Sequence, residues 1–192
     1  MQQSLFVKIA TVGLFSVGSS SIIAGSFLFT KTSNHTGTTQ IITDISRYQE
    51  IRNHKWSDIN QIKHFPVDIP GGAKAVSMAY SPGLMQGSSF FQIRFQQPPE
   101  QIQKLLLRYS KIADHQYWGG DTNSHSSQSN GVPTTFFYTG ESETEAFPNT
   151  YQIFVFKAQA QGQPGFKWNH GHSYGVAIDS STSEIVYWVE KW

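Results

Sequence analysis

The stretch from His64 to Gln96, HFPVDIPGGAKAVSMAYSPGLMQGSSFFQIRFQ, decides how the rest of the chain can fold. Its first two prolines exclude a helix at the start, because a residue that precedes proline is driven to extended geometry. The Ser-Pro-Gly sequence at 81–83 is a turn signal between two runs of alternating residues. The stretch therefore predicts two strands, at Ala73–Tyr80 and Ser88–Gln96, joined by a turn.

The second of these runs alternates clearly between apolar and polar residues. Phe91, Ile93 and Phe95 share one face, and Gln92 and Arg94 share the other. This pattern predicts a half-buried antiparallel strand whose second face contacts water at one end. A guanidinium on a wet face can bind an anionic group through two parallel hydrogen bonds. Arg94 and Gln92 are therefore candidate ligand-binding residues, and the alternative is that Arg94 pairs with a neighbouring carboxylate.

The elements that surround this stretch predict the fold class. Pro98-Pro99-Glu100 opens the clearest helix, in which apolar residues recur at helical spacing as far as Ala113. Shorter helices are predicted at Asp44–Asn53, with Thr43 as N-cap, and from Ser57, with Ile59 and Ile62 facing inward. Further strands are predicted at Thr134–Tyr138, Tyr151–Ala158, Ser173–Ile178 and Glu184–Trp192. The order α-α-β-β-α-β-β-β-β predicts an α+β fold, an antiparallel sheet of about five to six strands with helices on one face.

The N-terminal region has a different character. Ile9–Thr30 carries no charge over 22 residues, which is long enough for a membrane-spanning helix. Lys8 precedes this run and favours an orientation with the N-terminus in the cytoplasm. We expect residues 1–30 to be a transmembrane anchor, residues 31–43 to be a polar linker, and residues 44–192 to be a single domain outside the cytoplasm. The alternative is a signal peptide cleaved after Ser26, which would release a secreted protein.

Composition excludes several classes of function. The formal net charge is +1, and no basic cluster marks a nucleic-acid surface. The chain has no cysteine, which rules out thiolate nucleophiles and zinc–thiolate sites. The signatures of zinc peptidases, P-loop enzymes and dinucleotide-binding enzymes are absent, and we expect neither a serine-hydrolase elbow nor a cofactor.

The motifs HFPVDIP and PGLMQG and the PPEQI helix start carry a resemblance to a protein family. Over about residues 56–110 the chain resembles uncharacterised bacterial envelope proteins that have an N-terminal hydrophobic segment and HFPxxIP and PGxxQG motifs. No activity is attached to that family, so the resemblance implies a shared fold and an envelope location. Within the motif, we expect His64 to hydrogen-bond to the backbone.

Aromatic and acidic residues gather in the long polar segment Asp114–Pro133. Tyr117 and Trp118 are candidate ligand-binding residues, and His115 and Asp121 beside them could form an acid/base cluster. The alternative interpretation is a helix end capped by His115 and Gly119, with the aromatic side chains packing the loop onto the domain.

His170 and His172 are candidate metal ligands. Residues two apart on an extended chain point the same way, so both imidazoles can reach one ion. A third ligand would have to come from elsewhere, such as His115 or Asp121, and the alternative is a polar, glycine-rich start of a strand. The sequence predicts a membrane-anchored extracytoplasmic domain that binds an envelope protein, a polymer or a small ligand without catalysis. The alternative is a metal- or carboxylate-dependent hydrolase.

Overall fold

The computed structural model describes residues 41–83, 88–120, 124–138 and 144–192. These residues belong to one unit, which spans Thr38–Trp192. The predicted anchor or signal peptide at 1–30 and most of the predicted linker at 31–43 lie outside the described residues. In the part of the chain that the structure describes, no helix is long and apolar enough to cross a membrane.

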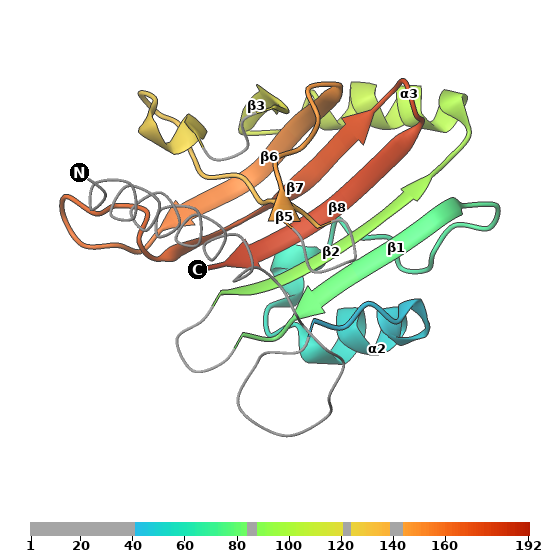
Figure 1. The fold of residues 1–192 in the computed structure, drawn as a ribbon, viewed down its shortest axis with the longest axis horizontal. Helices are drawn as coiled ribbons and strands as arrows, with labels where there is room; N and C mark the ends of the chain where they lie inside the picture. Colours follow the sequence, from blue (N-terminus) through green and yellow to red (C-terminus); the bar gives the residue numbers. More distant parts are fainter. Residues whose placement is uncertain (1–40, 84–87, 121–123, 139–143) are drawn as a thin grey trace, which may run out of the picture. The chain divides into compact units, whose positions relative to one another are not determined.

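Six strands form one antiparallel sheet in the order β1-β2-β8-β7-β6-β3 (Figure 1). Their bounds are β1 Lys74–Ser81, β2 Ser89–Gln96, β3 His115–Trp118, β6 Tyr151–Ala160, β7 Gly171–Asp179 and β8 Glu184–Lys191. The remaining two strands, β4 Phe137–Tyr138 and β5 Thr144–Glu145, pair only with each other. The sheet confirms the predicted antiparallel architecture, with β8 between β2 and β7.

Helical segments are few and mostly short. They are η1 Ile45–Arg47, α2 Tyr48–Glu50, η2 Ile51–Lys55, η3 Ile59–Ile62, α3 Pro99–Tyr109 and η4 Ser124–Ser127. The predicted helix at Asp44–Asn53 is therefore a run of 3₁₀, α and π turns. Its cap is Asp44 and not Thr43, since the Asp44 carboxylate accepts a hydrogen bond from the Ser46 N–H at 3.0 Å.

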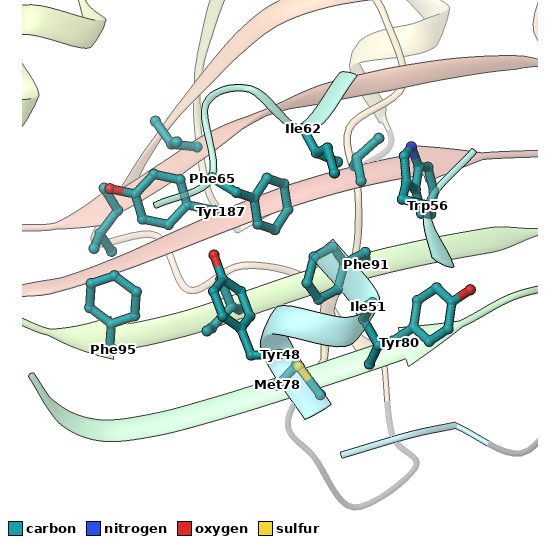
Figure 2. Close-up of a cluster of buried hydrophobic side chains, with 14 of the residues drawn as sticks. Tyr48, Ile51, Trp56, Ile62, Phe65, Met78, Tyr80, Phe91, Phe95 and Tyr187 are labelled. Carbon is teal, nitrogen blue, oxygen red and sulfur yellow. The ribbon is translucent and has the colours of Figure 1, made fainter. Parts of the chain in front are cut away.

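One face of the sheet, called here the helical face, packs against the first helical run (η1, α2 and η2), η3 and α3. Figure 2 shows its core, in which Tyr48 and Ile51 from the first helical run meet Phe91 and Tyr187 from the strands. Phe65 stacks on Phe91 with ring centroids 4.7 Å apart. η3 contacts β8 and α3 contacts β7, so the two segments lie over neighbouring central strands.

The opposite face is called here the loop face. It was predicted to contact water at one end of β2, where Arg94 and Gln96 are half-buried, whereas Phe90 and Gln92 are buried. The segments 125–138 and 146–150 cover it, and Val132, Phe137 and Phe147 pack there against Trp188. Gln92 on this face is only 2 % exposed. Its amide donates to the Phe136 carbonyl at 3.0 Å and accepts from the Tyr138 N–H at 3.0 Å. Gln92 therefore fixes the covering segment instead of meeting solvent.

Other departures from the sequence prediction are local. The segment Asp114–Pro133 contains β3, whose four residues pair with β6 and extend the sheet by one strand. Ile42 forms a bridge with Tyr80, so the predicted linker ends in residues that already belong to the domain. Ile59 was expected to face inward and is 50 % exposed, whereas Ile62 is fully buried.

Candidate ligand-binding cleft

A cleft of about 500 Å³ opens on the helical face between the His64–Pro66 loop and α3. Its floor consists of aromatic side chains from three adjacent strands, Phe156 of β6, Tyr174 of β7 and Tyr187 of β8. A bulge in β6 after Val155 places both Phe156 and Lys157 opposite Tyr174, and such a bulge redirects side chains at functional sites. The volume falls within the range of small-molecule sites, about 300–1,000 Å³.

His64 stands at the centre of this cleft. Its Nε2 donates a hydrogen bond to the Trp188 carbonyl at 3.1 Å, which confirms the predicted backbone contact. Its ring stacks on Tyr174 with centroids 5.4 Å apart and meets the edge of Phe156 at 5.4 Å. Burial lowers the pKa of His64 to about 3, although hydrogen bonds to backbone carbonyls oppose the shift. The His64 imidazole is therefore neutral at pH 7. It forms part of the wall of the cleft and is not a base with a pKa suited to proton transfer.

The tyrosine hydroxyls of the cleft remain protonated. Burial raises the pKa of Tyr187, and the neighbouring Tyr109 hydroxyl raises it further. Burial also raises the pKa of Tyr174, with smaller contributions from Asp114 and Asp58. A protonated phenol both donates and accepts hydrogen bonds, so these groups can orient a polar atom of a ligand.

The rim of the cleft is cationic. Lys63 and Arg108 are exposed and line it, and no carboxylate is among the lining residues. The Arg108 guanidinium lies 5.7 Å from the centroid of the Tyr109 ring, which holds it beside the opening. An apolar, aromatic interior beneath two positive charges is complementary to a ligand with an apolar body and an anionic group.

The predicted ligand-binding residues of the hairpin lie on the other side of the sheet. Arg94 lies over the Phe137 ring at 4.7 Å and pairs with Glu184 at 4.0 Å, as the alternative interpretation expected. The Tyr151 hydroxyl also hydrogen-bonds to Glu184. Arg94 and Gln92 are thus both engaged with the segments that cover the loop face, and neither lines the cleft.

Tyr117 and Trp118 lie on the edge strand β3 and do not share a site. Tyr117 stacks on His125 with centroids 3.9 Å apart, and its hydroxyl accepts a hydrogen bond from the Val132 N–H at 3.2 Å. Tyr117 therefore packs the following loop onto the domain, while Trp118 is 61 % exposed. His115 belongs to the strand and does not cap a helix. Asp121 lies outside the described residues.

The two candidate metal ligands differ in position. His172 is on β7, facing the same side as Tyr174, and is half-buried. Burial lowers its pKa, and Lys191 and Lys157 lower it further. His170 precedes the strand and is exposed. Within the described residues, no three His, Asp or Glu side chains gather in a way that could hold a metal ion. Metal binding by this pair stays a prediction.

The segment Gly171–Gly175, GHSYG, has the G-x-S-x-G spacing of a serine-hydrolase elbow, although no such elbow was expected from the sequence. An elbow requires a sharp turn from a strand to a helix that exposes the serine. Here the segment lies inside β7, and Ser173 is fully buried between Ala158 of β6 and Glu190 of β8. The spacing is therefore not a nucleophile elbow in this fold.

Comparison of the chain with protein-family models, with curated proteins and with solved structures finds no match. A function is therefore proposed from the geometry of the domain.

Proposed function

We propose that the protein is a membrane-anchored, extracytoplasmic binding domain whose ligand occupies the cleft between the His64–Pro66 loop and α3. The aromatic floor beneath a cationic rim is the observation that carries this proposal. His64 is neutral and held by the backbone, which suits a binding wall better than an acid/base catalyst.

The ligand that fits best is a compact molecule with an aromatic or apolar body and one acidic group. The apolar body would be enclosed by Phe156, Tyr174 and Tyr187. The acidic group would remain at the rim, where Arg108 and Lys63 can meet it without being buried. Because both cations are solvated, they contribute modest affinity, and most of the binding free energy comes from the burial of the ligand's apolar surface.

A pair of matched ligands tests this assignment. Naphthalene-2-carboxylate and naphthalene-2-methanol share an aromatic body and differ in charge, so isothermal titration calorimetry of both isolates the contribution of the rim. We expect the carboxylate to bind roughly two- to fivefold more tightly, which is the worth of an exposed charge pair.

Variants of α3 provide the control. Arg108→Gln should reduce the preference for the carboxylate, and Lys63 should account for what remains. Lys104→Gln removes the same charge from an exposed position of the same helix outside the cleft, and it should leave the preference intact. Absence of binding by both ligands, or an equal effect of the two variants, would contradict the proposed site.

The location rests on the uncharged run Ile9–Thr30 and on Lys8 before it. A phosphatase that is active only outside the cytoplasm, fused after Trp192, should be active in a bacterial host. Activity of a reporter that works only in the cytoplasm would refute the orientation. Retention in the membrane fraction after alkaline extraction distinguishes the anchor from a cleaved signal peptide.

A further inference from the structure

A second hollow, of about 470 Å³, lies where the connection between β6 and β7 meets the segment 126–131. It shares no lining residue with the cleft on the helical face. Its walls combine two aromatic rings, one lysine and three side-chain amides. These residues are Phe166, Trp168, Lys167, Gln128, Asn130 and Asn169.

The backbone that carries the two aromatic rings of this groove is ordered, and Phe166 is accessible. Phe166 is 71 % exposed, although the turn that carries it is hydrogen-bonded from the Phe166 N–H to the Gln163 carbonyl at 2.9 Å. The Trp192 indole N–H donates to the Trp168 carbonyl at 2.7 Å. The Lys167 ammonium lies 5.0 Å from the centroid of the Trp168 ring. Because these contacts fix the backbone and Trp168, a ligand would meet a surface that is already ordered.

The amides of the groove are unused. Gln128, Asn130 and Asn169 are exposed, and their side chains make no hydrogen bond to any residue that the structure describes. Each amide offers both a donor and an acceptor, which matches a hydroxyl that also does both. No carboxylate lines the groove, and its one cation already lies over an aromatic ring. The polar lining of the groove is therefore mostly neutral, with Lys167 as its single charged side chain.

We propose that this groove binds a neutral sugar chain built from pyranose rings with equatorial hydroxyls. Such rings present a flat face of C–H groups, which packs on Phe166 and Trp168, and a rim of hydroxyls, which can hydrogen-bond to the three amides. A shallow, open groove also suits a polymer, because the chain can extend beyond the bound unit at both ends. The assignment does not depend on the ligand of the cleft.

The test uses the full chain with chitohexaose and cellohexaose as probes, measured by calorimetry and by retardation in gels that contain hydroxyethyl cellulose. We expect at least one hexamer to bind at millimolar or lower concentration. Phe166→Ala should weaken binding about tenfold, since it removes one face of the apolar contact. Gln128→Ala should weaken it by a smaller factor.

Leu107→Ala is the matched control, because Leu107 is 64 % exposed on α3 and lies outside the groove. It should leave sugar binding unchanged, as should Arg108→Gln at the rim of the cleft. Absence of binding by both hexamers would overturn the proposal, as would binding that Phe166→Ala and Leu107→Ala affect equally. Loss of sugar binding in Arg108→Gln would assign the sugar to the cleft and not to the groove.

Discussion

Replacing Glu190 with glutamine should make the domain more stable than the parent protein in alkaline solution and leave its stability unchanged in acid. Glu190 lies on β8 between Phe90 of β2 and Ser173 of β7, and it is 8 % exposed. Among the described residues, no lysine or arginine forms an ion pair with it. Burial raises its pKa to about 7, although the Thr135 hydroxyl opposes the shift.

The raised pKa sets both the sign and the size of the effect. The folded domain binds the Glu190 proton more tightly than the unfolded chain, whose carboxyl titrates near 4.5. Below that pH both states are protonated and Glu190 has no influence on the pH dependence. As the pH rises towards 7 the unfolded chain releases its proton first, so stability falls by about 3 kcal/mol in all. Glutamine keeps the shape of the neutral acid and removes this loss.

Urea unfolding followed by tryptophan fluorescence checks the prediction at about pH 4.5, 6 and 8.5. Glu190→Gln should match the parent protein at the lowest pH and exceed its free energy of unfolding by about 3 kcal/mol at the highest. Glu100→Gln, at an exposed position in the first turn of α3, is the control and should show no such trend. A difference that stays constant with pH, or a variant that is less stable at pH 8.5, would refute the reasoning.

Four further substitutions test the packing around the sheet. Burial raises the pKa of Asp179, but hydrogen bonds lower it more, so the net shift is downward. Asp179→Asn should therefore reduce the free energy of unfolding by about 1 kcal/mol at pH 7. This difference between variant and parent should vanish as the pH falls below about 3.8. Gly175→Ala should prevent folding to a soluble product, because the new Cβ would lie 2.0 Å from the Phe154 carbonyl oxygen. Gln92→Leu should destabilise the domain by about 2–3 kcal/mol in urea unfolding, since the buried Tyr138 N–H and the partly buried Phe136 carbonyl lose their partners. Ser183 has a φ of 58°, a backbone conformation that costs the parent protein about 1 kcal/mol. Ser183→Gly should relieve this strain and raise the melting temperature slightly.

The sequence allows the strands and the main helix to be predicted because their signals are local. The alternation in Ser88–Gln96 predicts both ends of β2 to within one residue. The apolar spacing after Pro98 predicts the start of α3 equally well, but not its end. β3 is different, since its four residues have no pattern of their own and depend on pairing with β6. Ile112 matches the helical spacing and yet is 55 % exposed, because α3 ends at Tyr109.

The candidate site was harder to predict, since its residues come from distant parts of the chain. Gln92 alternates as a solvent-facing residue would, and its partners lie 44 and 46 positions further along the sequence. The cleft joins the His64–Pro66 loop to α3 and to three later strands. The periodicity of apolar residues shows which residues share a face of a strand. It does not show whether a distant segment of the chain covers that face. For this reason Arg94 was a candidate ligand-binding residue, although it lies on the face of the sheet opposite the cleft.

The position of β8 determines when the domain can fold. Among the described residues β8 is the last strand in chain order, yet it occupies the middle of the sheet, and seven of its eight residues are buried. Without it β2 and β7 have no partner on one side, and the two halves of the sheet cannot join. Folding must therefore wait until residue 191 has been synthesised, and long-range pairings of this kind form slowly.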